Sequence, residues 1–159
     1  MPTLKPGDGA PQIELTDQNG QKVKLSDFRG RKLLVYFYPK ADTPGCTKQA
    51  CSVRDHRADL TGLGIAVVGV SPDMPEDQKR FDEKYGLGFP LLADVDHQVA
   101  NAYGVWGEKS LYGKLFHGIT RSSFLVNEQG RISHVWYNVR PEDTVPKAKQ
   151  AITDTTQEG

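Results

Sequence analysis

Two uninterrupted apolar segments constrain the fold of this 159-residue chain more than any other feature. Residues 33–38 read Leu-Leu-Val-Tyr-Phe-Tyr and residues 65–70 read Ile-Ala-Val-Val-Gly-Val, and a proline follows each run within two residues. Strands that are apolar on both faces are typical of the centre of a parallel sheet, which helices cover on both sides. We therefore expect two buried strands joined by the helix that the sequence predicts over residues 44–60.

Weaker patterns predict the rest of an α/β fold. Residues 12–16 and 23–25 alternate polar and apolar side chains around Asn19-Gly20, which predicts an N-terminal β-hairpin. A second hairpin is predicted for residues 124–126 and 132–137. The remaining predictions are helices at 75–85, 98–103 and 146–154, a strand at 91–93 and a loop at 106–116. This order indicates a central mixed sheet flanked by helices, in one domain over residues 1–159.

The balance of charges argues against two classes of partner. Twenty Lys and Arg residues match twenty Asp and Glu residues, so the formal net charge is zero. Nothing therefore predicts binding to nucleic acid or to an anionic membrane. The apolar runs are too short to cross a bilayer, and the first residues lack the apolar stretch of a signal peptide. We expect a cytoplasmic protein and, because no segment indicates an obligate interface, a monomer.

The chain has two cysteines, Cys46 and Cys51. A permanent disulfide is not expected in a reducing compartment, so the pair is inert, metal-binding or redox-active. Cys46 falls in the first turn of the predicted helix, where unpaired backbone N–H groups and the helix dipole favour a thiolate. Such positions lower the pKa of a cysteine from ~8.5 to roughly 3.5–7.5. We therefore predict that Cys46 is a reactive nucleophile.

The loop before Cys46 supports this interpretation. Pro39 ends the strand because its nitrogen cannot donate to a neighbouring strand. Thr43 is placed to cap the helix, and Pro44 suits the first helical position. The free N–H groups of the first turn can also hold an oxygen-rich ligand beside the sulfur.

Cys51 follows Cys46 at a spacing that an intact helix cannot bridge. Five residues correspond to ~7.5 Å along the axis and ~140° around it. The two Cα atoms are then further apart than the ~7 Å beyond which a disulfide requires backbone movement. If the two cysteines bond, the first turns of the helix must unwind, so we predict that local unfolding gates disulfide formation.

A copper or zinc carrier is the alternative from another class. Cys46, Cys51 and His56 do not share one helical face, and the remaining histidines, His97, His117 and His134, show no ligand spacing. We therefore expect neither a metal nor an organic cofactor.

The segment Thr43-Pro44-Gly45-Cys46-Thr47, with Pro39 before it and Cys51 after it, resembles the active site of the peroxiredoxins. The spacing of the cysteines resembles the bacterioferritin comigratory protein, or peroxiredoxin Q, subfamily. The resemblance extends over most of the chain and includes residues 7–11, 26–30, 89–94 and 118–124. One departure is Gln49, where relatives often carry Glu; because Gln also accepts a hydrogen bond, we expect little change.

The resemblance implies a thioredoxin-like fold with an added N-terminal hairpin, and a role for each site residue. Cys46 would be the peroxidatic cysteine and Cys51 its resolving partner. Thr43 would hydrogen-bond the thiolate and the peroxide, Arg121 would supply a stabilising cation, and Pro39 would shield the pocket from water. Substrate contacts would come from Thr43, Gly45, Cys46 and Arg121.

The implied reaction is the reduction of hydrogen peroxide or an organic hydroperoxide. Cys46 would become a sulfenic acid, condense with Cys51 to an intramolecular disulfide, and be recycled by thioredoxin or a similar dithiol. A protein disulfide reductase on the same fold is the alternative within thiol chemistry. Such reductases usually carry a C-x-x-C pair at the start of the helix, which this sequence lacks.

Overall fold

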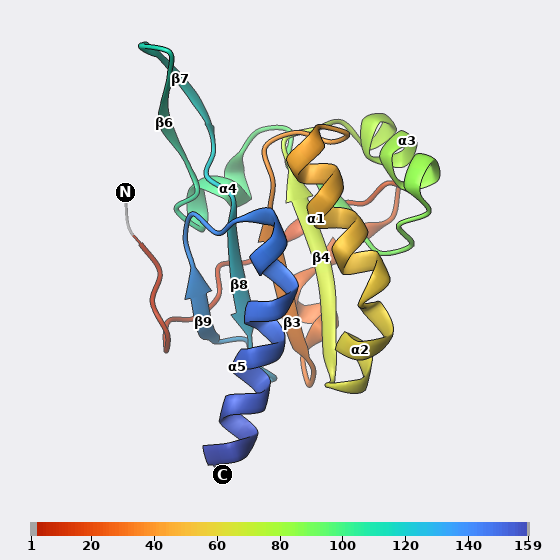
Figure 1. Ribbon diagram of the computed structural model, residues 1–159, viewed down its shortest axis with the longest axis vertical. Coiled ribbons are helices and arrows are strands. Elements are labelled where there is room, and N and C mark those ends of the chain that lie inside the picture. The colour runs from red at the N-terminus through yellow and green to blue at the C-terminus, as the bar shows by residue number, and fades with distance from the viewer. Residues whose placement is uncertain (1–2, 159) are drawn as a thin grey trace.

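The computed structural model describes residues 3–158; Met1, Pro2 and Gly159, which belong to the predicted domain, lie outside the described residues. Seven strands form one sheet in the order β2-β1-β5-β4-β3-β8-β9 (Figure 1). The strands are β1 (Glu14–Thr16), β2 (Lys22–Lys24), β3 (Lys32–Phe37), β4 (Ile65–Ser71), β5 (Leu91–Ala93), β8 (Ser122–Val126) and β9 (Ile132–Trp136). The pairs β3-β4 and β4-β5 are parallel and the others antiparallel, which confirms the mixed sheet and its N-terminal hairpin.

The two apolar runs form the centre of the sheet, as predicted. Every residue from Leu33 to Phe37 is at most 1% exposed, because helices cover both faces. The helices are α1 (Pro44–Asp55), α2 (Arg57–Gly62), α3 (Pro75–Tyr85), α4 (Gln98–Ala102) and α5 (Thr144–Glu158), with short 3₁₀ turns η1 (Leu25–Phe28) and η2 (Pro141–Asp143). None of the helices in residues 3–158 combines the length and the apolar character needed to cross a membrane.

Alternate side chains of β3 enter two separate cores. Leu34, Tyr36 and Tyr38 pack in one cluster with residues of α1, α2, α3 and α5. Leu33, Val35 and Phe37 pack in the other cluster with residues of α4 and of the N-terminal segment. This alternation follows from the two-residue repeat of a strand. In Figure 1, α1, α2 and α5 lie in front of the central strands, so the first cluster is the layer between them and the sheet.

The helix predicted for residues 44–60 is two helices, α1 and α2, which meet at His56. The backbone N–H of His56 is shared between the carbonyls of Ser52 and Val53, at 3.1 and 3.2 Å. The ring atom His56 Nδ1 lies 2.8 Å from the same Ser52 oxygen. The break itself is the departure of His56 from helical geometry, with φ of −108° and ψ of 11°.

The loop predicted for residues 106–116 is instead a hairpin, β6 (Trp106–Leu111) and β7 (Lys114–Ile119). Tyr112 and Gly113 form its two-residue turn with φ of 52° and 77°. Positive φ at both positions is the geometry of the turn that best fits the twist of a hairpin. Figure 1 shows this arm projecting from the body, at the end of the molecule where α1 begins.

Candidate active site

Cys46 lies in the first turn of α1, immediately after the loop that leaves β3. Its side chain is 1% exposed, and its thiol is free. The first helical hydrogen bond runs from Thr47 N–H to Thr43 O at 2.8 Å. Within the described part of the chain, the N–H groups of Gly45 and Cys46 donate to no protein acceptor. The sulfur therefore lies at the N-terminal turn of the helix, where backbone N–H groups are unpaired and the helix dipole is positive.

Thr43 occupies the N-cap position, but its side chain does not cap the helix. The predicted cap is wrong because Thr43 Oγ1 donates to Lys40 O at 2.8 Å and so closes the preceding turn. The expected bond from Thr43 to the thiolate therefore needs a rotation of the hydroxyl hydrogen away from Lys40. Such rearrangements are ordinary when a substrate binds, so this role stays a prediction.

Arg121 precedes β8 and reaches the sulfur from the neighbouring strand. Its Nη2 lies 3.4 Å from Cys46 Sγ, while its Nη1 donates to Gln49 Oε1 at 2.6 Å. Gln49 is fully buried and donates through Nε2 to Thr144 Oγ1 at 2.8 Å. The structure thus brings the predicted cation and the predicted nucleophile together. It also confirms that Gln49 accepts a hydrogen bond, and it adds Thr144, which no sequence pattern placed at the site.

Gly45 leaves room for this guanidinium. A Cβ atom at position 45 would lie 3.1 Å from Arg121 Nη2 and 3.6 Å from Pro141 Cγ. The first of these distances is shorter than about nine in ten real Cβ contacts, so the guanidinium would have to move by a few tenths of an ångström. A glycine at position 45 therefore lets Arg121 pass close to the helix start and reach Cys46.

Cys51 lies on the same uninterrupted helix as Cys46, which runs from Pro44 to Asp55. It is half-buried, and it packs against the cluster that contains Cys46. Pro39 is half-buried in the loop after β3. The resolving role of Cys51 and the shielding role of Pro39 stay predictions.

A buried chain of hydrogen bonds fixes the loop between β3 and α1. Tyr38, at the end of β3, donates its hydroxyl to Gln78 Oε1 at 2.5 Å. Gln78 Nε2 donates to Ser71 Oγ at 2.8 Å, and Ser71 Oγ donates to Asp73 Oδ2 at 2.6 Å. The same Asp73 oxygen accepts the backbone N–H of Ala41 at 2.7 Å. The chain therefore links the start of the loop to its middle through β4 and α3.

The C-terminal turn of α3 holds both ends of the segment that carries the cysteines. Asp42, at a φ of 61°, accepts Lys84 Nζ at 2.9 Å and the Tyr85 hydroxyl at 2.8 Å. Near the other end of α1, Arg54 Nη1 donates to Tyr85 O at 2.6 Å. The bond from Lys84, assisted by that from Tyr85, lowers the pKa of Asp42. We call these four residues the α3 clasp.

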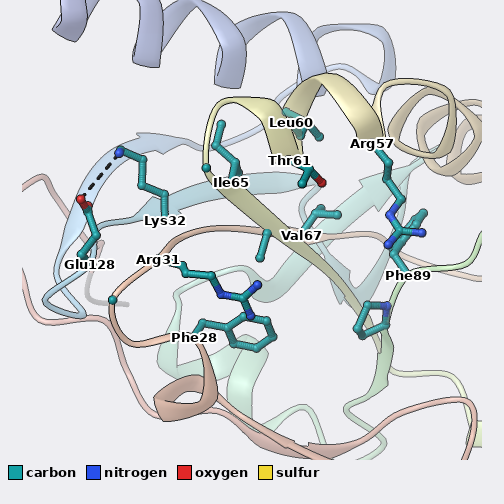
Figure 2. Close-up of a pocket in the computed structure, with 14 residues that line it drawn as sticks. Phe28, Arg31, Lys32, Arg57, Leu60, Thr61, Ile65, Val67, Phe89 and Glu128 are labelled. Atoms are coloured by element: carbon teal, nitrogen blue, oxygen red, sulfur yellow. Dashed lines mark ion pairs between the residues drawn. The ribbon is translucent and has the colours of Figure 1, made fainter.

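A cavity of about 430 Å³ lies at the opposite end of the sheet, where β3 and β4 begin. Figure 2 shows Arg31 and Arg57 at this cavity, with the ion pair of Lys32 and Glu128 at one side. Neither cysteine lines it. Among the residues that the structure describes, no group of three or more His, Cys, Asp or Glu side chains could hold a metal ion. The candidate site around Cys46 thus lies apart from this cavity, at the start of α1.

Comparison with known proteins identifies the family. Residues 6–135 match the family model of the AhpC/TSA family. Peroxiredoxin Bcp of Escherichia coli K12 is 54% identical over 136 residues, which cover 86% of this chain and 87% of the relative. A putative peroxiredoxin of Mycobacterium tuberculosis H37Rv is 49% identical over 150 residues, which cover 94% and 96%.

Solved structures agree with the sequence relatives. A structure of the bacterioferritin comigratory protein of Xanthomonas campestris, determined to study its alkyl peroxide reduction activity, gives a TM-score of 0.84 at 31% identity and covers 90% of this chain and 91% of that one. Peroxidoxin BcpB of Mycobacterium tuberculosis gives 0.85 at 31% identity and covers 95% and 97%. The free thiol beside a guanidinium therefore belongs to a thiol-dependent peroxidase with a thioredoxin-like fold, and the chain is a member of the peroxiredoxin family, of its Bcp or peroxiredoxin Q type.

Proposed function

We propose that Cys46 is the peroxidatic cysteine of this peroxiredoxin and that it reduces both hydrogen peroxide and organic hydroperoxides. The observation that carries the proposal is the 3.4 Å contact between Arg121 Nη2 and Cys46 Sγ in the first turn of α1. A guanidinium and the positive end of a helix both stabilise a thiolate, which is the form of cysteine that attacks peroxides. The alkyl peroxide reduction activity of the Xanthomonas relative supports the organic substrates.

In the first step, the Cys46 thiolate attacks one oxygen of the hydroperoxide. A sulfur–oxygen bond forms, the O–O bond breaks, and the departing oxygen takes a proton and leaves as water or an alcohol. Arg121 and the free N–H groups of the first turn face the negative charge that develops on the separating oxygens. Thr43 donates to the peroxide once its hydroxyl turns from Lys40, and Pro39 keeps water from the pocket.

In the second step, the Cys51 thiolate attacks the sulfur of the Cys46 sulfenic acid. The S–O bond breaks, hydroxide leaves and is protonated to water, and a disulfide joins the two residues. Because both cysteines lie on one continuous helix, α1 unwinds before this bond forms.

The disulfide is then reduced by an external dithiol, for which we propose thioredoxin. An intramolecular pair needs no second subunit, so the protein acts as a monomer of one domain. The reaction requires neither a metal nor an organic cofactor, and it takes place in the cytoplasm, where dithiol reductants are present.

Two cysteine variants test these roles. Cys46→Ser is expected to abolish peroxide consumption in the presence of thioredoxin, thioredoxin reductase and NADPH. Cys51→Ser is expected to consume about one equivalent of peroxide per chain and then stop, because the first step remains and the second is lost. NADPH oxidation and intact-protein mass spectrometry follow the two steps.

Turnover by Cys46→Ser would overturn the assignment of the nucleophile. A peptide map of the peroxide-treated wild-type protein without a Cys46–Cys51 bond would remove Cys51 from the reaction. An insulin reduction assay separates a peroxidase from a protein disulfide reductase, because only the latter reduces insulin rapidly without peroxide.

A further inference from the structure

Two buried hydroxyl groups of the central sheet have no hydrogen-bond partner within the protein. Among the described residues, the buried side-chain oxygens that no protein group satisfies are Tyr36 Oη and Ser123 Oγ. The two side chains are 0% and 1% exposed. They occupy directly opposed positions on β3 and β8, so they point to the same face of the sheet.

That face is the one that α1 covers. Tyr36 belongs to the cluster that contains Cys46, Ala50 and Val53 of α1. On β4, Tyr36 lies beside Gly69, where a Cβ atom would come within 3.0 Å of the phenol oxygen. The phenol therefore fills the space that a glycine leaves between the sheet and the helix.

An unpaired hydroxyl destabilises the state in which it is buried, because it has lost its bonds to water and gained none in exchange. Burial raises the pKa of Tyr36 well above its usual value, so the phenol stays protonated. When α1 unwinds, water can reach the hydroxyl and satisfy it.

We propose that Tyr36 and Ser123 are positioning residues for the step in which Cys51 reaches Cys46. Their unpaired hydroxyls lower the stability of the closed form of α1 relative to the open form. The closed form keeps Arg121 against Cys46 for the reaction with peroxide, and the open form allows the disulfide. This inference rests on the proposed Cys46–Cys51 disulfide.

Tyr38, which directly follows the same strand, provides a matched control. It lies on the same face as Tyr36 and is 1% exposed, but its hydroxyl donates to Gln78 Oε1. Removing the hydroxyl of Tyr38 leaves a buried acceptor without its donor, whereas removing that of Tyr36 leaves nothing unpaired. The two substitutions delete the same atom and should act in opposite directions.

The experiment compares Tyr36→Phe with the wild-type protein in two states. In the reduced protein, amide hydrogen exchange of residues 46–51 is expected to slow about tenfold, because the closed helix loses an unsatisfied group. After one equivalent of peroxide, disulfide formation is expected to slow by a similar factor, and excess peroxide should convert more Cys46 to the sulfinic acid. Ser123→Ala should shift all three readouts in the same direction, and Tyr38→Phe should not slow the exchange.

Unchanged or faster exchange in both Tyr36→Phe and Ser123→Ala would overturn the proposal, because the hydroxyls would then be satisfied in solution, for instance by buried water. Slower exchange with an unchanged rate of disulfide formation would also overturn it, because opening would not govern the second step. A wild-type protein that consumes peroxide but forms no Cys46–Cys51 bond would instead contradict the proposed function. In that case the exchange rates would still measure the equilibrium between the closed and open forms of α1.

Discussion

Arg121 connects the sulfur of Cys46 to Gln49 and, through Gln49, to Thr144. It binds Cys46 with one guanidinium nitrogen and Gln49 with the other, and Gln49 is held in turn by Thr144 of α5. A planar guanidinium offers two donors in a fixed geometry, which a lysine ammonium does not. The orientation of the cation therefore depends on Gln49 and Thr144 as well as on Cys46.

Replacing Arg121 is expected to slow the reaction with peroxide more than any change outside α1. For Arg121→Gln, kcat/KM for peroxide should fall by about 10²–10³, the usual effect of removing one donor to a developing negative charge. Stopped-flow measurement of Cys46 oxidation gives the rate directly. Arg140→Gln is the control, because Arg140 is exposed and pairs with Glu142 rather than with the sulfur.

Gly45→Ala should act through the same guanidinium, since the new Cβ would lie 3.1 Å from Arg121 Nη2. The single variant is expected to lose about tenfold in rate, and the double variant with Arg121→Gln should be no slower than Arg121→Gln alone. A double variant whose losses multiply would show that Gly45 acts independently of Arg121.

The residues of the motif could be predicted from sequence, but the contacts that hold them could not. Cys46, Gly45 and Arg121 were expected at the site, and the structure brings them together. The bond from Gln49 to Thr144 joins residues 95 positions apart, and that from Tyr85 to Asp42 joins residues 43 apart. No local pattern specifies such pairs, because they form only when the elements pack.

At the scale of elements, the uninterrupted apolar runs predicted the centre of the sheet well, and the differences arose at short local features. Both central strands lie where their apolar runs predicted, because burial on two faces leaves few alternatives. The hairpin of β6 and β7 was predicted as a loop, because its Tyr-Gly turn lacks the Asn or Asp that usually marks a two-residue hairpin turn. The break at His56 is a change in the backbone angles of one residue, and residue type alone does not reveal this.

The α3 clasp should oppose the effect of the two unpaired hydroxyls. Asp42→Asn and Tyr85→Phe each remove a contact that holds the loop before α1, so α1 should open more often. We expect amide exchange of residues 46–51 and disulfide formation to accelerate a few-fold, because exposed ion pairs and hydrogen bonds contribute modestly. Tyr112→Phe is the control, since Tyr112 is 96% exposed at the tip of the arm.

A clasp variant can also lower the stability of the whole protein. If amide exchange in α1 then accelerates no more than amide exchange in β3 and β4, the clasp has no specific role in the opening of α1. Exchange measured along the whole chain distinguishes this global effect from a local one.

At the scale of the whole molecule, three exposed ion pairs make stability depend on pH. Hydrogen bonds from Lys84, Lys149 and Arg140 lower the pKa values of Asp42, Asp59 and Glu142, respectively. A carboxyl group whose pKa is lower in the folded state contributes stability above its unfolded pKa, about 3.9 for Asp and 4.3 for Glu. That contribution is lost as the pH falls through the folded pKa.

The melting temperature of the reduced protein is therefore expected to fall as the pH is lowered from 6 to 3. Because the pairs are exposed, 0.5 M salt should flatten this dependence. Thermal melts at low and high salt test the expectation. If the melting temperature rises as the pH is lowered, or does not change with salt at any pH, these ion pairs do not contribute to stability.

The arm formed by β6 and β7 also has a practical consequence. Its turn carries Tyr112, the most exposed of the large hydrophobic side chains among the described residues, and the arm lies outside the seven-stranded sheet. Exposed turns that the packed layers do not depend on tolerate added sequence well. Position 112–113 is thus the natural attachment point for an affinity tag or a fluorescent reporter, which would leave α1 free to open and close.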